Sequence, residues 1–266
     1  MGDGKNKSEK IKFLEKELKF IKYSQETVSK YLFYVGKFID SGKNPKEFLE
    51  KYVNKNKSRN TIRSVYFALN FYYKQVLNKG FNEKIPLVKR KQVLPNVLNK
   101  QEINEMLKVT ENLQHKLVLM FLYYGGLRLN EVRNLKWEDL DFERKTIQLK
   151  IAKGEHQRTI FLHEKLIFDL NRFKIPRKGL VFESNRGKKY SKETIQKIVK
   201  NSARKANINK KVSPHTLRHS FATHLLEAGC DIRNIQQLLG HKNLQTTQIY
   251  THVANKNIKN LSKLLD

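Results

Sequence analysis

Cysteine is nearly absent from the sequence, since Cys230 is the only one among 266 residues. A single thiol excludes an intrachain disulfide framework and a metal site built from several thiolates, which fits a reducing compartment. No apolar run approaches the roughly 18 residues that a membrane-spanning helix needs. The N-terminal stretch also lacks the apolar core followed by small residues that marks a secretory signal. We therefore expect a soluble, cytoplasmic protein with no membrane partner.

Acidic residues are scarce relative to basic ones: 25 Asp and Glu stand against 54 Lys and Arg, a net charge of +29. A charge of this size attracts polyanions, and the phosphate backbone of a nucleic acid is the default partner. Lysine far outnumbers arginine, and asparagine and isoleucine are common, so biased coding in an AT-rich genome is the simpler alternative. The sequence has no Walker A motif and no acidic cluster for paired metal ions, and we expect no cofactor.

The N-terminal 83 residues predict a small all-helical domain. Apolar residues recur at helical spacing over 8–20, 24–42, 45–55 and 57–80. Ser24 is placed to cap the second of these helices, Gly42 and Pro45 close it, and Gly80 is expected to stop the fourth. Lys55, Lys57, Arg59 and Arg63 cluster near the start of the fourth helix, where they could contact phosphates.

Residues 84–98 lose this periodicity and contain Pro86, Pro95 and the basic run Lys89-Arg90-Lys91. Such a stretch is typical of an extended basic linker, which either follows a phosphate backbone or is a solvated connector.

A second domain is expected over residues 99–266, and most of it is helical. Helical patterns cover 99–110, 112–126, 127–141, 164–173 and 191–205, and the second of these is apolar enough to be a buried central helix. β-branched alternation on both sides of Gly154 predicts a hairpin instead. The fold class is therefore mainly α with a small antiparallel β-sheet.

The stretch "SPHTLRHSFATHLLEAG" predicts a helix that begins after Ser213, with Pro214 in its first turn. Leu217 and Phe221 share a face that packs inward, while His215 and Arg218 lie on another face near the helix start. The free N–H groups of a helix start favour a bound anion, and an arginine fork beside an imidazole makes a good phosphate receptor.

The histidines of this helix have two simpler explanations. His215 and His219 are four residues apart, as zinc ligands on a helix can be, but Thr216 stands where the zinc-protease pattern has glutamate, and no third ligand is evident. His219 and His224 fit better as helix-surface or core histidines bonded to backbone groups.

The stretch "DIRNIQQLLGHKNLQTTQIYTHV" predicts a helix capped by Asp231 and ended by Gly240. His241 therefore follows directly on a sharp turn. A short helix from Asn243 would carry Tyr250, which taken alone is an ordinary aromatic residue.

Together these stretches resemble the tyrosine recombinase (phage integrase) family, and within it the Xer-type site-specific recombinases. "GGLRLNEVRNLKWEDLD", "KIAKGEHQRTIFL", "HTLRHSFATHLL", "LLGH" and "YTH" match its motifs in order over residues 98–266. The resemblance implies a helical, SAM-like core-binding domain followed by a catalytic domain. It also implies the catalytic residues Arg128, Lys153, His215, Arg218, His241 and the nucleophile Tyr250.

In that case Arg128, Arg218 and His241 would hold the phosphate, His215 would take the proton of Tyr250, and Lys153 would protonate the leaving 5′-oxygen. Glu131 would orient Arg128 or His215, or form a surface salt bridge. The resemblance implies a covalent 3′-phosphotyrosyl intermediate on double-stranded DNA and a homotetramer, with the tail after Tyr250 docking on its own domain or on a neighbour. Chromosome dimer resolution is the expected role. The alternatives are a mobile-element integrase, a nick-closing enzyme of the type IB topoisomerase kind and a non-catalytic DNA-binding protein.

Overall fold

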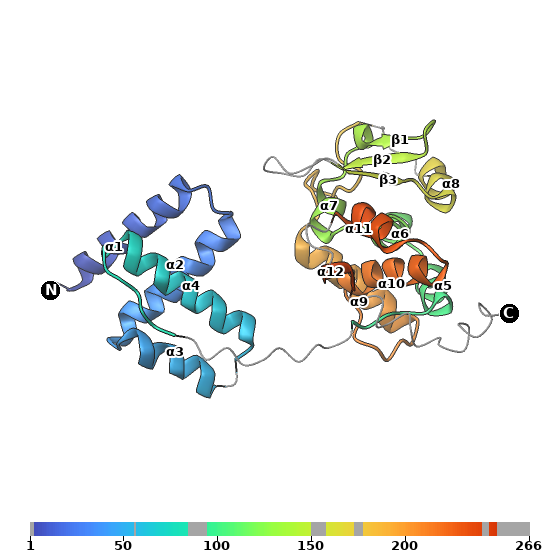
Figure 1. Cartoon of the computed structure of the whole chain (residues 1–266). Helices are drawn as coiled ribbons and strands as arrows, with labels where there is room; N and C mark the ends of the chain where they lie inside the picture. The colour runs from blue at the N-terminus through green and yellow to red at the C-terminus, as the bar shows by residue number, and fades with distance from the viewer. Residues whose placement is uncertain are drawn as a thin grey trace. The chain divides into compact units, whose positions relative to one another are not determined.

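The chain divides into two compact units, Met1–Lys91 and Gln92–Asp266 (Figure 1). The computed structural model describes residues 3–55, 57–84, 95–149, 158–172, 178–240 and 245–248. The division falls inside the segment expected to be a linker, of which residues 85–94 lie outside the described part.

The N-terminal unit consists of helices over the described residues, in the order α1 (Asp3–Phe20), α2 (Gln25–Ser41), α3 (Pro45–Asn54) and α4 (Arg59–Gln75). Ser24, Asn44 and Ser58 each accept a hydrogen bond from a backbone N–H in the first turn of the helix that follows, which satisfies a donor that a helix start leaves unpaired. The apolar stripes meet in one core that includes Leu14, Leu18, Val35, Phe48 and Leu69. Capping and periodicity thus account for the helices predicted here.

The fourth predicted helix is shorter than expected. It ends at Gln75 and not at Gly80, because Asn78 adopts a left-handed backbone conformation with φ of 50°. Asparagine tolerates that conformation well, since its short side chain hydrogen-bonds locally. The prediction that Gly80 stops the helix was therefore wrong.

The C-terminal unit begins with α5 (Lys100–Lys108), α6 (Leu113–Tyr123) and α7 (Leu129–Asn134). Helix α6 is buried, as its composition predicted, with Leu117 to Leu122 all inside the core. The single helix expected over 127–141 was wrong: α7 stops at Asn134, and a 3₁₀ turn, Trp137–Asp139, leads into a strand.

A three-stranded antiparallel sheet follows, in the order β1 (Leu140–Asp141), β2 (Thr146–Leu149) and β3 (Arg158–Phe161). The β2–β3 pairing confirms the predicted hairpin, with Leu149 opposite Arg158, although Gly154 at its expected turn lies outside the described residues. The sheet also contains β1. This strand has only two residues, which are too few for an alternation of apolar and polar side chains to predict it.

The remaining helices are α8 (Glu164–Arg172), α9 (Lys192–Lys205), α10 (Pro214–Glu227), α11 (Ile232–Leu239) and α12 (Gln245–Gln248). Helix α10 packs against α6, α9 and α11. The face expected to carry His215 and Arg218 is only partly open to solvent: His215 is exposed, whereas Arg218 is 4% exposed. None of the described helices combines the length and apolar character that crossing a membrane requires.

Candidate active site

The carboxylate of Glu131 lies at the centre of a group of three arginines. Arg128 Nη1 donates to Glu131 Oε1 at 2.9 Å, and Arg158 donates to both carboxylate oxygens at 2.8 and 2.7 Å. The Arg218 Nη1 atom lies 3.9 Å from Oε2. Three guanidinium groups around one carboxylate leave this set cationic, which suits an anionic ligand. We call these four residues the arginine cluster.

Arg128 is held in place by the start of helix α7. Its backbone N–H donates to Glu131 Oε2 at 2.6 Å, so Glu131 caps the helix that follows Arg128. Its Nη2 atom donates to the carbonyl of Gly240 at 2.7 Å. The Arg128 side chain is 36% exposed, so it is the arginine of the cluster that an incoming phosphate can reach most directly.

Arg218 lies in the first half of α10, one turn after His215, and its side chain is 4% exposed. Its guanidinium donates to two backbone carbonyls: Nη1 bonds to Gly126 and Nη2 bonds to Leu239 at 2.5 Å. Gly126 has φ of +56° and packs so closely on Phe221 that a Cβ there would lie 2.4 Å from the ring. The turn after α6 and the end of α11 together fix the direction of this guanidinium.

His215 is exposed at the start of α10 next to these arginines. Partial loss of solvent lowers the pKa of its imidazole below the ordinary 6.5, and the charges of Arg218 and Arg128 lower it further. The imidazole is consequently neutral at pH 7, the form that can accept a proton.

His219 lies one turn further along α10, with its ring centroid 6.3 Å from that of His215. Burial, His215 and Arg218 lower the pKa of His219 to about 4. A neutral His219 adds no positive charge beside His215.

Burial by itself raises the pKa of the Glu131 carboxyl. The pKa is nevertheless lowered, because hydrogen bonds and charge from Arg158, the N–H of Arg128 and the charge of Arg218 together have the larger effect. Glu131 is therefore ionised, and its side chain is only 16% exposed. Of the three roles left open by the sequence, orientation of Arg128 fits this geometry, and a surface salt bridge does not.

The structure thus brings together Arg128, His215 and Arg218, which are 90 positions apart at their extremes. The other three residues implied by the resemblance, Lys153, His241 and Tyr250, lie outside the described residues. Their place in the chain is informative nonetheless: Lys153 falls between the paired strands β2 and β3, and His241 directly follows Gly240.

Sequence reasoning missed Arg158. Its signal was present in β3, where Arg158 and Ile160 are buried and Thr159 and Phe161 are exposed. An arginine on the inward face of a strand needs a partner inside the protein, because burying an unpaired charge is very costly.

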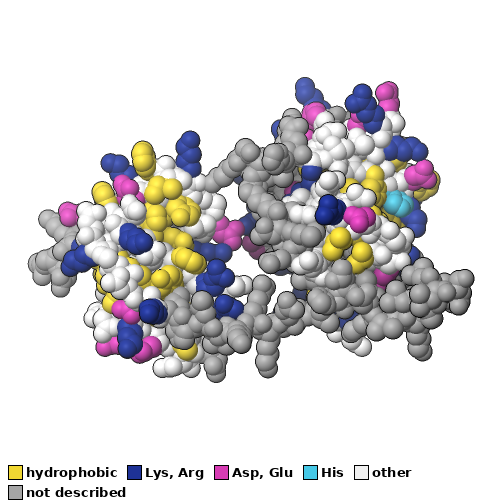
Figure 2. Space-filling model, in the orientation of Figure 1, with side chains coloured by type: hydrophobic (Ala, Val, Ile, Leu, Met, Phe, Trp, Pro, Cys, Tyr) yellow, Lys and Arg dark blue, Asp and Glu magenta, His cyan; other side chains and the backbone are white. Residues whose placement is uncertain are grey.

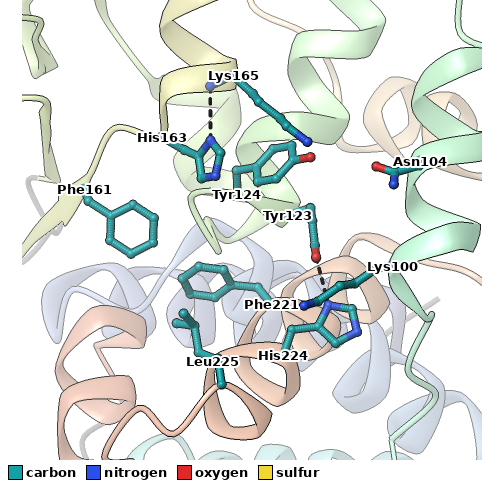
Figure 3. A pocket seen from close by; sticks show the side chains of 11 residues that line it. Lys100, Asn104, Tyr123, Tyr124, Phe161, His163, Lys165, Phe221, His224 and Leu225 are labelled. Atoms are coloured by element: carbon teal, nitrogen blue, oxygen red, sulfur yellow. Dashed lines mark hydrogen bonds between the residues drawn. The ribbon is translucent and has the colours of Figure 1, made fainter.

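His224 belongs to a different place, a 320 Å³ pocket lined mainly by α5, α6 and α10 (Figure 3). Its Nδ1 atom is hydrogen-bonded to the hydroxyl of Tyr123 at 2.8 Å. Burial, with help from Tyr124 and Glu227, raises the pKa of Tyr123 to about 12, so this phenol stays protonated. His224 therefore bonds the backbone of Leu98, as predicted, and a side chain as well. No group of three His, Cys, Asp or Glu suited to a metal occurs within the described ranges.

The site on this mostly helical domain is a cationic cluster with a neutral imidazole at its edge. Such a site defines a class of protein that binds an anion such as phosphate and moves a proton beside it.

Comparison with known proteins identifies the family within this class. Residues 96–257 match the model of the phage integrase family. The chain is 39% identical over 247 residues to tyrosine recombinase XerA of Pyrococcus horikoshii, which covers 89% of this chain and 86% of the relative.

Tyrosine recombinase XerD of Listeria innocua is 34% identical over 227 residues, which is 78% of this chain and 76% of the relative. The crystal structure of a XerA recombinase aligns with a TM-score of 0.60 and 29% identity, over 97% of this chain and 98% of that one. The chain belongs to the phage integrase family, the tyrosine recombinases, as the motifs predicted. It is an enzyme that cleaves and rejoins DNA through a phosphotyrosine intermediate.

Proposed function

We propose that this chain is a Xer-type recombinase in which Tyr250 attacks the scissile phosphate of duplex DNA inside the arginine cluster. The observation that carries this assignment is the convergence of Arg128, Arg218 and His215 from α7 and α10, with both guanidinium groups bonded to the last carbonyls of α11. The chain continues from that point into His241 and, nine residues later, Tyr250.

The arginine cluster supplies fixed positive charge for a phosphodiester under attack. Negative charge grows on the two non-bridging oxygens as the nucleophile approaches, and donors fixed in advance stabilise it without reorganising. Arg128 and Arg218 carry out this stabilisation, and His241 adds a hydrogen bond. The carbonyl and carboxylate partners of the two arginines keep them oriented before DNA arrives.

Proton transfer accompanies the exchange of one ester for another. The phenol of Tyr250, with an ordinary pKa near 10, gives its proton to the neutral imidazole of His215. Its oxygen bonds to phosphorus, the bond to the 5′-oxygen breaks, and Lys153 protonates that oxygen. Attack by a 5′-hydroxyl from another strand reverses these steps and releases Tyr250, so the bond energy is conserved.

The substrate we propose is a double-stranded recombination site on the chromosome, synapsed by a tetramer, and the role is chromosome dimer resolution. The net charge of +29 favours binding to a DNA backbone. The similarity to XerA and XerD recombinases over most of the chain favours the Xer role over that of a mobile-element integrase.

The test is a DNA duplex with a nick beside the scissile phosphate, so that the short fragment diffuses away after cleavage and the covalent adduct accumulates. Because the recombination site is unidentified, the probe is a library of fragments of the source genome that carry nicks at random positions. Wild-type protein should capture one fragment class covalently, and Tyr250→Phe should bind the same DNA without an adduct.

The identity of the captured fragment separates the candidate roles. A single chromosomal site supports dimer resolution, whereas fragments from the ends of a mobile element would support an integrase. Joining of two different duplexes is expected of a recombinase, and closure confined to the original duplex would contradict it.

A further inference from the structure

Arg158 is the arginine of the cluster that the motif-based assignment leaves without a role. Its side chain is 6% exposed, and it comes from β3. Its guanidinium is turned toward Glu131, with both Nη atoms donating to the carboxylate. We infer that Arg158 is a positioning residue: its guanidinium fixes the carboxylate that holds Arg128, and its stem supports the turn at Gly240 that precedes His241.

The first link runs through Glu131. Arg158 Nη1 and Nη2 donate to Oε1 and Oε2 at 2.8 and 2.7 Å, a two-pronged pairing that allows the carboxylate only one orientation. The same two oxygens accept from Nη1 and the backbone N–H of Arg128. Rotation of the carboxylate would therefore break the contacts that hold Arg128.

The second link runs through Gly240. A Cβ at this residue would lie 2.8 Å from Arg158 Nη1 and 3.0 Å from its Cδ, so the turn rests directly on the arginine stem. Gly240 also has φ of +60°, and its carbonyl accepts from Arg128 Nη2. Arg158 is thus in contact with both partners of the Arg128 guanidinium.

The inference rests on the proposed function, because it gives Arg158 a task in the same phosphate site. Its test compares Arg158→Met and Arg158→Lys with wild type in single-turnover cleavage and, separately, in DNA binding. Arg158→Met should keep its DNA affinity and cleave about 100-fold more slowly, the effect of a small misplacement of a catalytic group. Arg158→Lys keeps the charge but not the fork, and should fall between the two.

Arg144→Met is the matched control. Arg144 is an exposed arginine in the turn between β1 and β2, and its side chain lies 3.9 Å from the carboxylate of Asp141. It should cleave like wild type.

A pH profile supplies a readout that simple loss of packing would not give. Among the residues that the structure describes, the charged groups facing Glu131 are Arg128 at the N-cap of α7, Arg158 from β3 and Arg218 from α10. Removal of Arg158 takes away the strongest influence that lowers the Glu131 pKa, while burial, which raises it, remains. The pH at which Glu131 takes up a proton, followed by NMR of its side-chain carboxyl, should therefore be higher in Arg158→Met and unchanged in Arg144→Met.

Gly240→Ala tests the second link while Arg158 stays in place. The added methyl collides with Nη1 and Cδ of Arg158, so cleavage should fall sharply. In the Arg158→Met background the collision with Nη1 is gone and only a contact at the position of Cδ remains, so the same substitution should cost less. Such non-additivity is the sign of direct coupling.

The results separate the two claims. Wild-type protein that forms no adduct would remove the proposed function and this inference with it. Wild-type protein that forms the adduct, together with an Arg158→Met protein that cleaves equally fast, would overturn the inference alone. Equal losses of DNA binding and cleavage, or additive effects of Gly240→Ala and Arg158→Met, would likewise overturn it.

Discussion

The two arginines of the family motif differ in how the protein holds them. Arg128 is 36% exposed and bonds to a carboxylate and one carbonyl, whereas Arg218 is 4% exposed and bonds to two carbonyls inside the protein. Both guanidinium groups are held in a fixed orientation, but Arg218 also satisfies buried backbone acceptors at Gly126 and Leu239. In the proposed mechanism, the same residue type therefore contributes to phosphate binding at one position, and to phosphate binding and stability at the other.

We predict that Arg218→Ala and Arg128→Ala both bind DNA and both fail to cleave it, but differ in stability. Arg218→Ala leaves buried carbonyls unpaired, which costs about 1–3 kcal/mol for each such group, and it should unfold at a clearly lower temperature than Arg128→Ala. Trp137 is buried and is the only tryptophan, so its fluorescence follows unfolding of the C-terminal unit. Equal melting temperatures would contradict the structural role of Arg218.

The lowered pKa of His215 predicts the pH dependence of cleavage. Above its pKa the imidazole is neutral and accepts a proton, and below it the base is lost. Because burial and the neighbouring arginines lower the pKa below the ordinary 6.5, the single-turnover rate should fall to half of its plateau at a pH below 6.5. Titration of the His215 ring by NMR should give the same midpoint. A midpoint at or above pH 6.5 would contradict the effect of the neighbouring arginines.

Helix α10 packs against α6, α9 and α11, and its first turns lie at the candidate active site. The turn that ends α6 passes so close to it that Gly126 meets the Phe221 ring. This contact lets the Gly126 carbonyl reach Arg218, so packing between two helices sets the position of the Arg218 side chain.

Gly126→Ala should be strongly destabilising, and Gly187→Ala is its matched control. Both glycines have positive φ, +56° and +66°, so both substitutions carry a similar backbone strain of about 1–2 kcal/mol. Only Gly126 has a neighbour in the way, whereas a Cβ at Gly187 meets nothing within 4 Å. Trp137 fluorescence should show a larger loss of melting temperature for Gly126→Ala, and similar losses would contradict the close packing.

The sequence predicted those elements whose signals are local. Ser24, Asn99 and Ser213 cap helices through their own side chains, and a helical apolar stripe follows each. The end of α4 was wrong because a left-handed Asn78 competes with Gly80, and nothing in a single sequence decides between them. Strand β1 was missed because it exists only through its pairing with β2.

The residues of the candidate site also divide into those with a signal in the sequence and those that depend on contacts between distant parts of the chain. His215 and Arg218 were found through their place near the start of a predicted helix, and Arg128 through motif resemblance, since no local pattern shows that α7 and α10 meet. Arg158 was missed because its role depends on contacts with Glu131 and Gly240, which are 27 positions before it and 82 after it. Only the three-dimensional structure brings these residues together.

At the scale of the whole molecule, positive charge is spread over both units. On the face drawn in Figure 2, Lys and Arg side chains surround exposed hydrophobic side chains of the N-terminal unit. The exposed residues Lys55, Lys57 and Arg63 lie near the start of α4, and Arg63 stands over the Phe67 ring at 5.8 Å. A polyanion can be held by many such contacts at once.

DNA affinity should therefore fall steeply with salt. If about 6–10 phosphates are contacted, affinity should drop roughly 10³–10⁵-fold between 50 and 200 mM salt. Lys57→Ala and Arg63→Ala should each reduce the slope of log K against log salt by about 1. The control is Lys30→Ala, whose ammonium is already paired with Glu26 at 3.0 Å. Slopes unchanged in all three variants would contradict a phosphate contact by the start of α4.

The most direct test of the account is to identify the residue that becomes esterified to DNA. The adduct trapped on nicked DNA is digested with protease and nuclease, and the peptide carrying the remaining nucleotide is sequenced by mass spectrometry. The modified residue should be Tyr250, and the reaction should proceed equally well in excess chelator. A nucleotide attached to any other side chain, or cleavage that stops when divalent ions are removed, would contradict the account.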